Sequence, residues 1–409
     1  MEPKEVLQVF SILPKELSAE IFSHFSTSER RHLVEAFSEE ETLDLLLHMQ
    51  MDDRVDLLEE LPANLVNRLL NLTEPSLRQE INRYLGYEEE SAGGVMTSEF
   101  VAIRKDLTVA EAIETFKHSS YTRVSSNELF VTDDRWRMEG VVSLKTLLLS
   151  TPETRVAEVM DSHFISTTTG TDQEEVARLF RKYDLRAMPV TDKELRLVGV
   201  ITVDDVMDVV VQEQTEDLQK MAAMEPSETP YLEQNVWSLS KHRIGWLMIL
   251  MVTATITGGI ISSYEDLLSQ AVTLAIFIPM LMDTGGNAGS QSSTLMIRSI
   301  ALGEVKFRDF FTVLWKELRV GLLCGLVLVL ALLNTVRVLL VSDASMAVAI
   351  VVNISIIATV VFSKVLGGIL PILSDKMGLD PAMMTGPLIT TVVDTCALLI
   401  YFAMASLLL

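Results

Sequence analysis

The sequence predicts a multidomain membrane protein in which a soluble part, made of an α-helical and an α/β region, precedes a bundle of membrane helices. Charge and hydropathy both support this division. Residues Met1 to Asn235 include 46 acidic and 23 basic residues, whereas Val236 to Leu409 include 10 of each. The long apolar segments all lie in the second stretch, and the mean hydropathy of the whole chain is +0.32. An acidic soluble half is therefore joined to a neutral membrane half.

The acidity of the first half repels nucleic acid and anionic lipid headgroups and attracts cations. The alternative is that the acidity only keeps the domain soluble. The start of the chain, MEPKEVLQVF, has no basic n-region and no long apolar core, so we expect no signal peptide and a cytoplasmic soluble half. Cys324 and Cys396 both lie in apolar segments, which leaves no disulfide framework.

A twelve-residue pattern recurs from about Leu43 to Leu85, as LLLHMQMDDRVD, LLEELPANLVNR and LLNLTEPSLRQE. Each unit opens with a leucine pair, which suits short helices that stack into a right-handed helical array. We expect residues 1–90 to form this helical scaffold. Asp52, Asp53 and Asp56 share one face of such a helix, either as a solvated face or as a metal site.

A second repeat covers residues 91–211, with one copy in 91–155 and the other in 156–211. The pattern of each copy predicts a strand, a turn and a helix, followed by a hairpin and a second helix. The two copies resemble a tandem pair of CBS domains, which implies an adenine nucleotide such as ATP, or ions, as ligand. Thr202 and Asp205 in GVITVDD match the ribose-binding pattern of that family, whereas the first copy departs from it with Ser143 and Thr146.

Residues 212–242 connect the soluble half to the membrane. The polar stretch from 212 to 224 predicts a helix on which Glu213, Glu216 and Asp217 form one acidic face. Such a helix, placed between a sensor and a pore, is where a gate would be moved. A plain linker helix is the alternative.

Residues 243–409 contain five apolar segments, namely Ile244 to Ser263, Leu267 to Ile297, Val320 to Val336, Ala347 to Leu373 and Pro381 to Leu409. The second carries Asp283, the fourth Lys364 and the fifth Asp394. Basic residues cluster before the first segment and between the second and third, while Glu265, Asp266 and Asp343 lie in the opposite loops with Arg337. The positive-inside rule then places the soluble half in the cytoplasm and the C-terminus outside.

Asp394 lies near the middle of the last apolar segment. An unpaired carboxylate there costs at least ~2.5 kcal/mol on insertion scales, so we expect it to face the bundle interior or a water-filled path. An ion pathway is the favoured hypothesis, and a protonated or helix-bridging aspartate is the alternative.

Small and polar residues gather in the second segment, in IPMLMDTGGNAGSQSSTLMIRS. Gly285 and Gly286 permit close helix approach, or an irregular backbone that lines a cavity. Asn287 and Gln291, one turn apart, would present amide oxygens to a hydrated ion, unless they only hydrogen-bond between helices.

The order of these features resembles the MgtE family of magnesium channels. The resemblance rests on TGGNAGSQ (284–291), GPLITTVVDTCALLIYF (386–402), the tandem CBS copies and the short-helix array. It implies a homodimer with five membrane helices per subunit, a connecting plug helix and a pore lined by the second and fifth membrane helices. Asp394 matches the pore carboxylate of the family, and Thr390 a position whose carbonyl lines the ion site.

The resemblance also implies regulatory magnesium ligands in the soluble half and at the pore mouth. Their matching positions are Asp52, Asp56, Asp172, Glu174, Asp184, Asp205, Asp208, Glu213, Glu216, Asp217 and Asp380. Carboxylate and carbonyl oxygens are the ligands that Mg²⁺ takes, usually while keeping several waters. The six histidines are scattered singly, so no zinc or copper cluster is expected.

We therefore predict a Mg²⁺-selective channel of the cell membrane that is closed by cytosolic Mg²⁺. Its partners would be Mg²⁺, membrane lipid and a second copy of the chain, without nucleic acid. An ion-coupled divalent cation carrier and a membrane-anchored Mg²⁺ or nucleotide sensor are the alternatives. No nucleophile elbow, Walker loop or paired histidine ligands occur, so we do not expect an enzyme.

Overall fold

The computed structural model describes residues 9–10, 12–119, 127–227, 231–232, 234–331, 345–384 and 386–409. The chain divides into two compact units, Met1–Glu213 and Gln214–Leu409. Arg337 and Asp343, which entered the orientation argument, lie outside the described residues, as do the last residues of the third apolar segment, 332–336.

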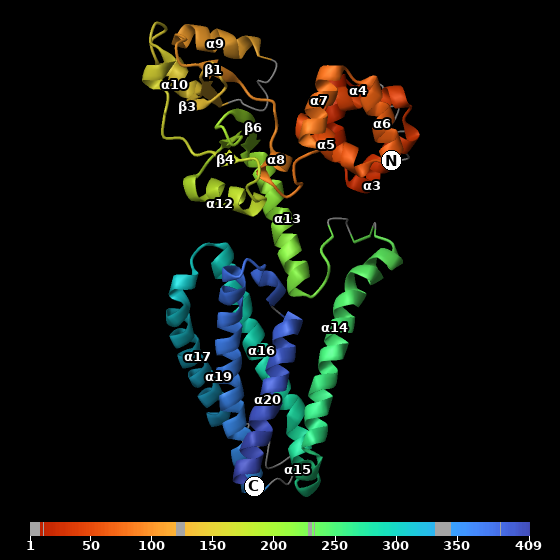
Figure 1. Ribbon diagram of the computed structural model, residues 1–409, viewed down its shortest axis with the longest axis vertical. Coiled ribbons are helices and arrows are strands. Elements are labelled where there is room, and N and C mark those ends of the chain that lie inside the picture. Colours follow the sequence, from red (N-terminus) through yellow and green to blue (C-terminus); the bar gives the residue numbers. More distant parts are fainter. Residues whose placement is uncertain are drawn as a thin grey trace. The chain divides into compact units, whose positions relative to one another are not determined.

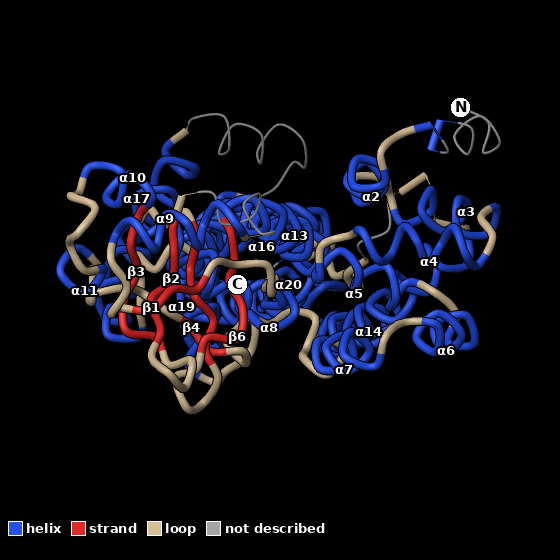
Figure 2. The backbone as a smooth tube through the Cα atoms, turned by 90° about the horizontal axis from the view of Figure 1, so that it is seen from above, coloured by secondary structure: helices blue, strands red, loops and turns tan. Residues whose placement is uncertain are grey.

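The N-terminal unit begins with a row of short helices, and from the second of them onward each starts 12 residues after the one before it. They are α2 (Lys15–Ser23), α3 (Thr27–Ala36), α4 (Glu39–His48), α5 (Met51–Glu60), α6 (Ala63–Leu72) and α7 (Pro75–Tyr84). Capping boxes at Ser26 and Ser38 start α3 and α4, because each serine and the glutamate three residues later satisfy two backbone donors. Helices two apart in sequence contact each other, as α3 does α5 and α4 does α6 (Figure 2).

Two α/β modules follow with the same topology. The first contains α8 (Ala92–Val95), β1 (Ala102–Arg104), α9 (Val109–His118), β2 (Glu128–Thr132), β3 (Met138–Ser143) and α10 (Leu144–Leu149). The second contains α11 (Val156–Val159), β4 (Thr167–Thr168), α12 (Gln173–Tyr183), β5 (Ala187–Thr191) and β6 (Leu197–Thr202). The first short helix of each copy packs on the other module: α8 contacts β4, β6 and α12, and Val156 of α11 lies in the core of the first module. In each sheet the first strand is parallel to the second, the third is antiparallel to it, and the hairpin has a bulge at the same place. The internal repeat predicted from the sequence is thus present in the backbone.

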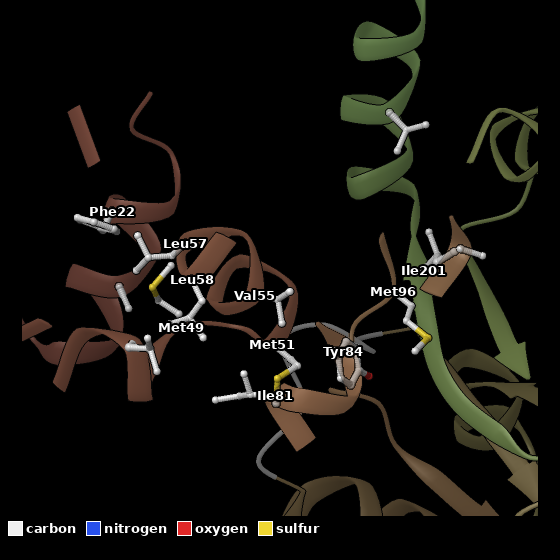
Figure 3. Close-up of a cluster of buried hydrophobic side chains, with 14 of the residues drawn as sticks. Phe22, Met49, Met51, Val55, Leu57, Leu58, Ile81, Tyr84, Met96 and Ile201 are labelled. Carbon is white, nitrogen blue, oxygen red and sulfur yellow. The ribbon is translucent and has the colours of Figure 1, made fainter. Parts of the chain in front are cut away.

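One hydrophobic core joins the short helices to the second module. Figure 3 shows Phe22, Leu57 and Leu58 among the short helices, with Met96 and Ile201 in the same cluster. All five side chains are at most 2 % exposed. Burial of this kind stabilises by about 25 cal/mol per Å² of apolar surface. Tyr84 at the end of α7 adds a contact, because its hydroxyl lies 3.5 Å from the Val198 carbonyl oxygen of β6, the strand before α13 (Val203–Met221).

The C-terminal unit is a bundle of long helices (Figure 1). Its elements after α13 are α14 (Val236–Ser263), α15 (Glu265–Gln270), α16 (Thr273–Ala301), η1 (Phe307–Asp309), α17 (Phe310–Leu330), α19 (Met346–Lys376), η2 (Pro381–Met384) and α20 (Gly386–Leu408). Helix α19 packs against α16, α17 and α20, and α14 packs against α20. Tyr401 of α20 is buried and its hydroxyl donates to the carbonyl oxygen of Leu274 at 3.0 Å.

Of the helices in the described residues, α14, α19 and α20 are long and apolar enough to cross a membrane by length and composition. Helices α16 and α17 have 29 and 21 residues, but they carry more polar and charged side chains. The five-helix count therefore stays a prediction.

Glycines set the distance between α16 and its neighbours. A Cβ added to Gly367 of α19 would lie 2.2 Å from the carbonyl oxygen of Gly289, and one added to Gly285 would lie 2.7 Å from Thr359 Cγ2. These contacts leave no room for a side chain. Helix α16 also continues through Pro279, so the irregular backbone considered for this stretch is absent from α16.

Two segments differ from the expected ones. The connecting helix, expected over 212 to 224, is the second half of α13, which starts at Val203 and ends at Met221. The last apolar segment begins with the short 3₁₀ turn η2, and α20 starts only at Gly386. Asp394 is therefore the ninth of the 23 residues of α20 rather than its middle.

A candidate ion path and candidate metal sites

A row of exposed polar residues runs along one face of α16. It consists of Asp283, Asn287, Gln291, Thr294 and Arg298, and we call it the polar stripe. The spacing of four, four, three and four residues places all five on one side of a helix. A helix that crosses a membrane does not expose such a row to lipid. If α16 is such a helix, this face borders a water-filled path or another protein surface.

Asp394 lies on the side of α20 that meets α16. A Cβ added to Gly286 would lie 3.9 Å from Asp394 Oδ1 and 3.1 Å from Thr390 Cγ2. The carboxyl group of Asp394 is half-buried, and Asp283 of the polar stripe lies within electrostatic range of it. Asp283 was not assigned to the path from the sequence, although its position four residues before Asn287 on a helix carries that signal.

The remaining predicted pore residues fall into two groups. Gly285 and Gly286 are buried by α19 and α20, so in one chain they serve close packing, and their lining role stays a prediction. Thr390 is half-buried and its hydroxyl donates to the Pro387 carbonyl oxygen at 3.0 Å.

Gln291 makes an interhelical contact of the kind considered as the alternative. Its amide oxygen, expected to face a hydrated ion, lies 3.3 Å from the ammonium nitrogen of Lys364.

The end of α13 meets the start of α20 within the C-terminal unit. The Lys220 ammonium lies 2.5 Å from Glu216 Oε1 and 2.7 Å from Asp380 Oδ2. Burial alone would lower the pKa of Lys220, but hydrogen bonds to these two carboxylates raise it above its usual value. Burial, followed by the charge of Asp380, raises the pKa of Asp217. The sequence interpretation missed Lys220, which holds two of the predicted ligands together.

A second acidic cluster lies within the N-terminal unit, where α5 faces the first turns of α13. Burial raises the pKa of Asp52 well above its usual value, and the charges of Asp205 and Asp53 add to the shift. Burial also raises the pKa of Asp53, which has Asp208 as an acidic neighbour. Burial raises the pKa of Asp205 as well, and the charge of Asp53 adds to that shift. Asp52 Oδ1 is buried without a hydrogen-bond partner among the described residues. Carboxylate oxygens are ligands that Mg²⁺ takes, and the assignment of Asp52 and Asp205 as its ligands stays a prediction.

Of the other predicted ligands, Asp56 lies near enough for its charge to add to the raised pKa of Asp52. Asp172 caps α12 by accepting from the Glu174 N–H at 2.8 Å, and Asp184 ends that helix with a left-handed backbone. Glu213 accepts from Gln173 Nε2 at 2.6 Å, and Asp56 is exposed. Within the described residues no three histidine, cysteine, aspartate or glutamate side chains gather closely enough to hold a metal ion on their own. These assignments stay predictions.

The candidate ribose-binding pair, Thr202 and Asp205, forms the N-terminal cap of α13. The backbone N–H and the hydroxyl of Thr202 donate to Asp205 Oδ2 at 3.0 and 2.7 Å. Asp205 thus belongs both to this cap and to the acidic cluster with Asp52. The predicted nucleotide site and the predicted Mg²⁺ site therefore share this residue.

The acidic cluster predicts that the N-terminal unit is destabilised as the pH rises. The pKa values of Asp52, Asp53 and Asp205 are higher in the folded state than in the unfolded state, so the folded state binds more protons. Its stability therefore falls as the pH rises through the folded-state pKa values. In the full chain, the Tm of this unit without Mg²⁺ should be lower at pH 7.5 than at pH 5, by roughly 2 to 4 °C for each kcal/mol. Thermal unfolding with and without Mg²⁺ measures this, and Mg²⁺ should raise the Tm chiefly at pH 7.5.

Asp52→Asn should raise the Tm in the absence of Mg²⁺ and reduce the response to Mg²⁺. The matched control is Glu158→Gln, which alters an exposed carboxyl of the second α/β module. Equal pH dependence in the Asp52→Asn variant and the wild type would contradict the role of the cluster.

The C-terminal unit is a bundle of long apolar helices with a polar stripe and a half-buried carboxylate. One helix links it to an acidic unit with paired α/β modules. This is the organisation of a membrane transporter of cations. Comparison with protein families agrees. A model described as a divalent cation transporter, MgtE, matches residues 278–404, the MgtE intracellular N domain matches 1–90, and the CBS domain matches 92–151 and 156–212. The chain belongs to the MgtE family.

Individual relatives cover nearly the whole chain. A protein named magnesium transporter MgtE from Thermus thermophilus is 38% identical over 98% of this chain and 89% of its own length. One of the same name from Bacillus subtilis is 32% identical over 99% of this chain and 92% of its own. The solved soluble part of a magnesium transporter is 31% identical over 52% of this chain and 84% of its own, with a TM-score of 0.50.

Proposed function

We propose that this chain is a Mg²⁺-selective channel of the cell membrane, that it works as a homodimer, and that cytosolic Mg²⁺ closes it. The observation that carries the proposal is the polar stripe of α16 beside Asp394. A row of five polar side chains exposed on a membrane helix needs a wet or proteinaceous surface opposite it. A second copy of the same face would supply that surface and enclose a path.

The path suits a hydrated divalent cation. Mg²⁺ dehydrates reluctantly and is usually bound through one or two carboxylates while it keeps several waters. Two symmetry-related Asp394 carboxylates would hold such an ion through its waters, which is favourable enough for entry and weak enough for release. The names of the relatives from Thermus thermophilus and Bacillus subtilis support magnesium as the cargo.

Closure by Mg²⁺ is supported by the two acidic clusters. Facing carboxylates repel by ~1 kcal/mol per pair in water-like surroundings and by more where they are partly desolvated. Mg²⁺ at Asp52 and Asp205, and at Glu216 and Asp217, would relieve this repulsion and hold α13 in the position that closes the path. The ion closes the channel only because it binds this state better than the open one.

The orientation in the membrane belongs to the same proposal. The basic residues before α14 and between α16 and α17 place the N-terminal unit in the cytoplasm and the C-terminus outside. ATP bound at Thr202 and Asp205 would then act from the cytosolic side.

The test is electrical recording of the purified chain in planar bilayers, with magnesium uptake measured in vesicles from the same preparation. We expect discrete Mg²⁺ currents that shrink as Mg²⁺ rises on the side of the N-terminal unit. Silent bilayers together with vesicle uptake would show a carrier, and silence in both would leave a membrane-anchored sensor. Either result would overturn the channel.

A further inference from the structure

Lys364 is a buried cation in the middle part of α19 that the proposed ion path does not use. Its side chain is 6 % exposed. A charged ammonium inside a membrane bundle is costly and is found paired or turned toward a polar cavity. Lys364 lies 12 residues before the end of the helix at Lys376, a distance of about 18 Å along the axis. A lysine side chain cannot span that length to reach the headgroups.

Three oxygen atoms of α16 surround the Lys364 ammonium. Its Nζ atom lies 3.3 Å from Gln291 Oε1, 3.4 Å from the Ala288 carbonyl oxygen and 3.5 Å from Ser292 Oγ. An ammonium has three donors, so each has one acceptor. The distances are at the long end of the hydrogen-bond range, which means that none of the three contacts alone secures the charge.

Glu317 of α17 supplies the balancing negative charge through Ser292. The Ser292 hydroxyl donates to Glu317 Oε2 at 2.7 Å. Because a serine has a single O–H proton, its oxygen has only lone pairs left for Lys364. The contacts from Lys364 to Ser292 and from Ser292 to Glu317 thus fix one orientation of the serine hydroxyl. They also link the helices α19, α16 and α17.

Two glycines of α19 keep the three helices close at this level. Gly367 lies against the Gly289 carbonyl oxygen, and a Cβ added to Gly368 would lie 2.7 Å from Glu317 Cγ. The glutamate is therefore held beside α19 by packing as well as by its hydrogen bond.

Gln291 connects this buried network to the polar stripe. It is exposed on α16, yet its amide oxygen is directed at Lys364. Because an ammonium only donates, the oxygen rather than the NH₂ group must face it, and the NH₂ group is turned away from Lys364. The water molecules around a Mg²⁺ ion direct their hydrogens outward, so an NH₂ group beside the path offers no ligand that competes with them.

We propose that Lys364 is a positioning residue that sets cation selectivity: it holds the Gln291 oxygen away from the ion path, so that ions pass with their waters retained. The inference rests on the proposed transport function. Mg²⁺ dehydrates reluctantly, whereas Ca²⁺ accepts six to eight protein oxygens in flexible geometry. A Gln291 oxygen released toward the path therefore favours Ca²⁺ over Mg²⁺.

The experiment measures the ratio of Ca²⁺ to Mg²⁺ influx into vesicles that contain the full-length chain, with indicator dyes for the two ions. Lys364→Met should raise this ratio on the order of tenfold, the effect of one charge-assisted hydrogen bond. Gln291→Met has no amide oxygen and gives the reference ratio for a path without it, and the double variant Lys364→Met with Gln291→Met should match that reference. Lys316→Met, on an exposed lysine of α17, is the matched control.

The suppression by Gln291→Met separates positioning from a purely structural role, because a loosened bundle would not be repaired by a second substitution. If Lys364→Met does not fold, Lys364→Met with Glu317→Gln carries the test, since removing both buried charges together is far less costly than removing one. The inference is overturned if Lys364→Met leaves the ratio of Ca²⁺ to Mg²⁺ influx unchanged. The same holds for Lys364→Met with Glu317→Gln where only that variant folds. A raised ratio that Gln291→Met fails to suppress also overturns it. A wild-type chain that moves neither ion would instead refute the proposed function.

Discussion

We expect Asp394→Asn to reduce Mg²⁺ conduction by at least about 100-fold, the effect of losing ~2.7 kcal/mol of ion stabilisation. Asp394 is half-buried where α20 meets α16. Asparagine keeps the size of the side chain and removes its charge, so the glycine contacts between the helices should persist. The loss would then report the electrostatic role of the carboxylate, measured as single-channel current in bilayers and as vesicle uptake.

Two comparisons make this result specific. Asp375→Asn removes a carboxylate from the exposed end of α19 and should leave conduction near the wild-type level. Asp283→Asn, on the polar stripe, should give a smaller loss than Asp394→Asn, because Asp283 is exposed and more strongly screened. Conduction that survives in Asp394→Asn would show that the path does not run past this carboxylate.

The sequence predicted the soluble architecture because its signals are local. The leucine pairs at 45–46, 57–58 and 69–70 mark the buried face of successive helices. The repeated hairpins predicted two equal modules, and the family models cover the same stretches.

The candidate sites could be predicted only where one helix contains the signal. The acidic face of 213, 216 and 217 and the carboxylate at 394 are visible in one segment. The contact of Lys220 with Asp380 joins residues 160 positions apart, and that of Lys364 with Gln291 joins residues 73 apart. Helix periodicity indicates which face such a lysine occupies but not which partner neutralises it, because the partner depends on how the helices pack.

The second large effect is expected on regulation. Neutralising Asp205, Asp208, Glu216 and Asp217 together, as asparagine or glutamine, should raise the cytosolic Mg²⁺ concentration for half-inhibition at least about tenfold, with open-channel conduction retained. All four residues lie on α13, which begins in the N-terminal unit beside Asp52 and ends in the C-terminal unit near Asp380. Asparagine and glutamine lack the charged carboxylate that Mg²⁺ prefers as a ligand, so the ion binds the closed state more weakly. The ion then loses its preference for the closed state.

Two half-variants separate the contributions. The pair Asp205→Asn and Asp208→Asn removes the α13 side of the cluster with Asp52, and the pair Glu216→Gln and Asp217→Asn removes the cluster at the end of α13. If Mg²⁺ acts on the two clusters in one closing step, each pair should shift the inhibition curve and the fourfold variant should shift it further. Because Lys220 binds both Glu216 and Asp380, the second pair should also weaken the contact between α13 and the start of α20 in the absence of Mg²⁺. Inhibition curves of the fourfold variant that overlie those of the wild type would show that Mg²⁺ closes the path without these carboxylates.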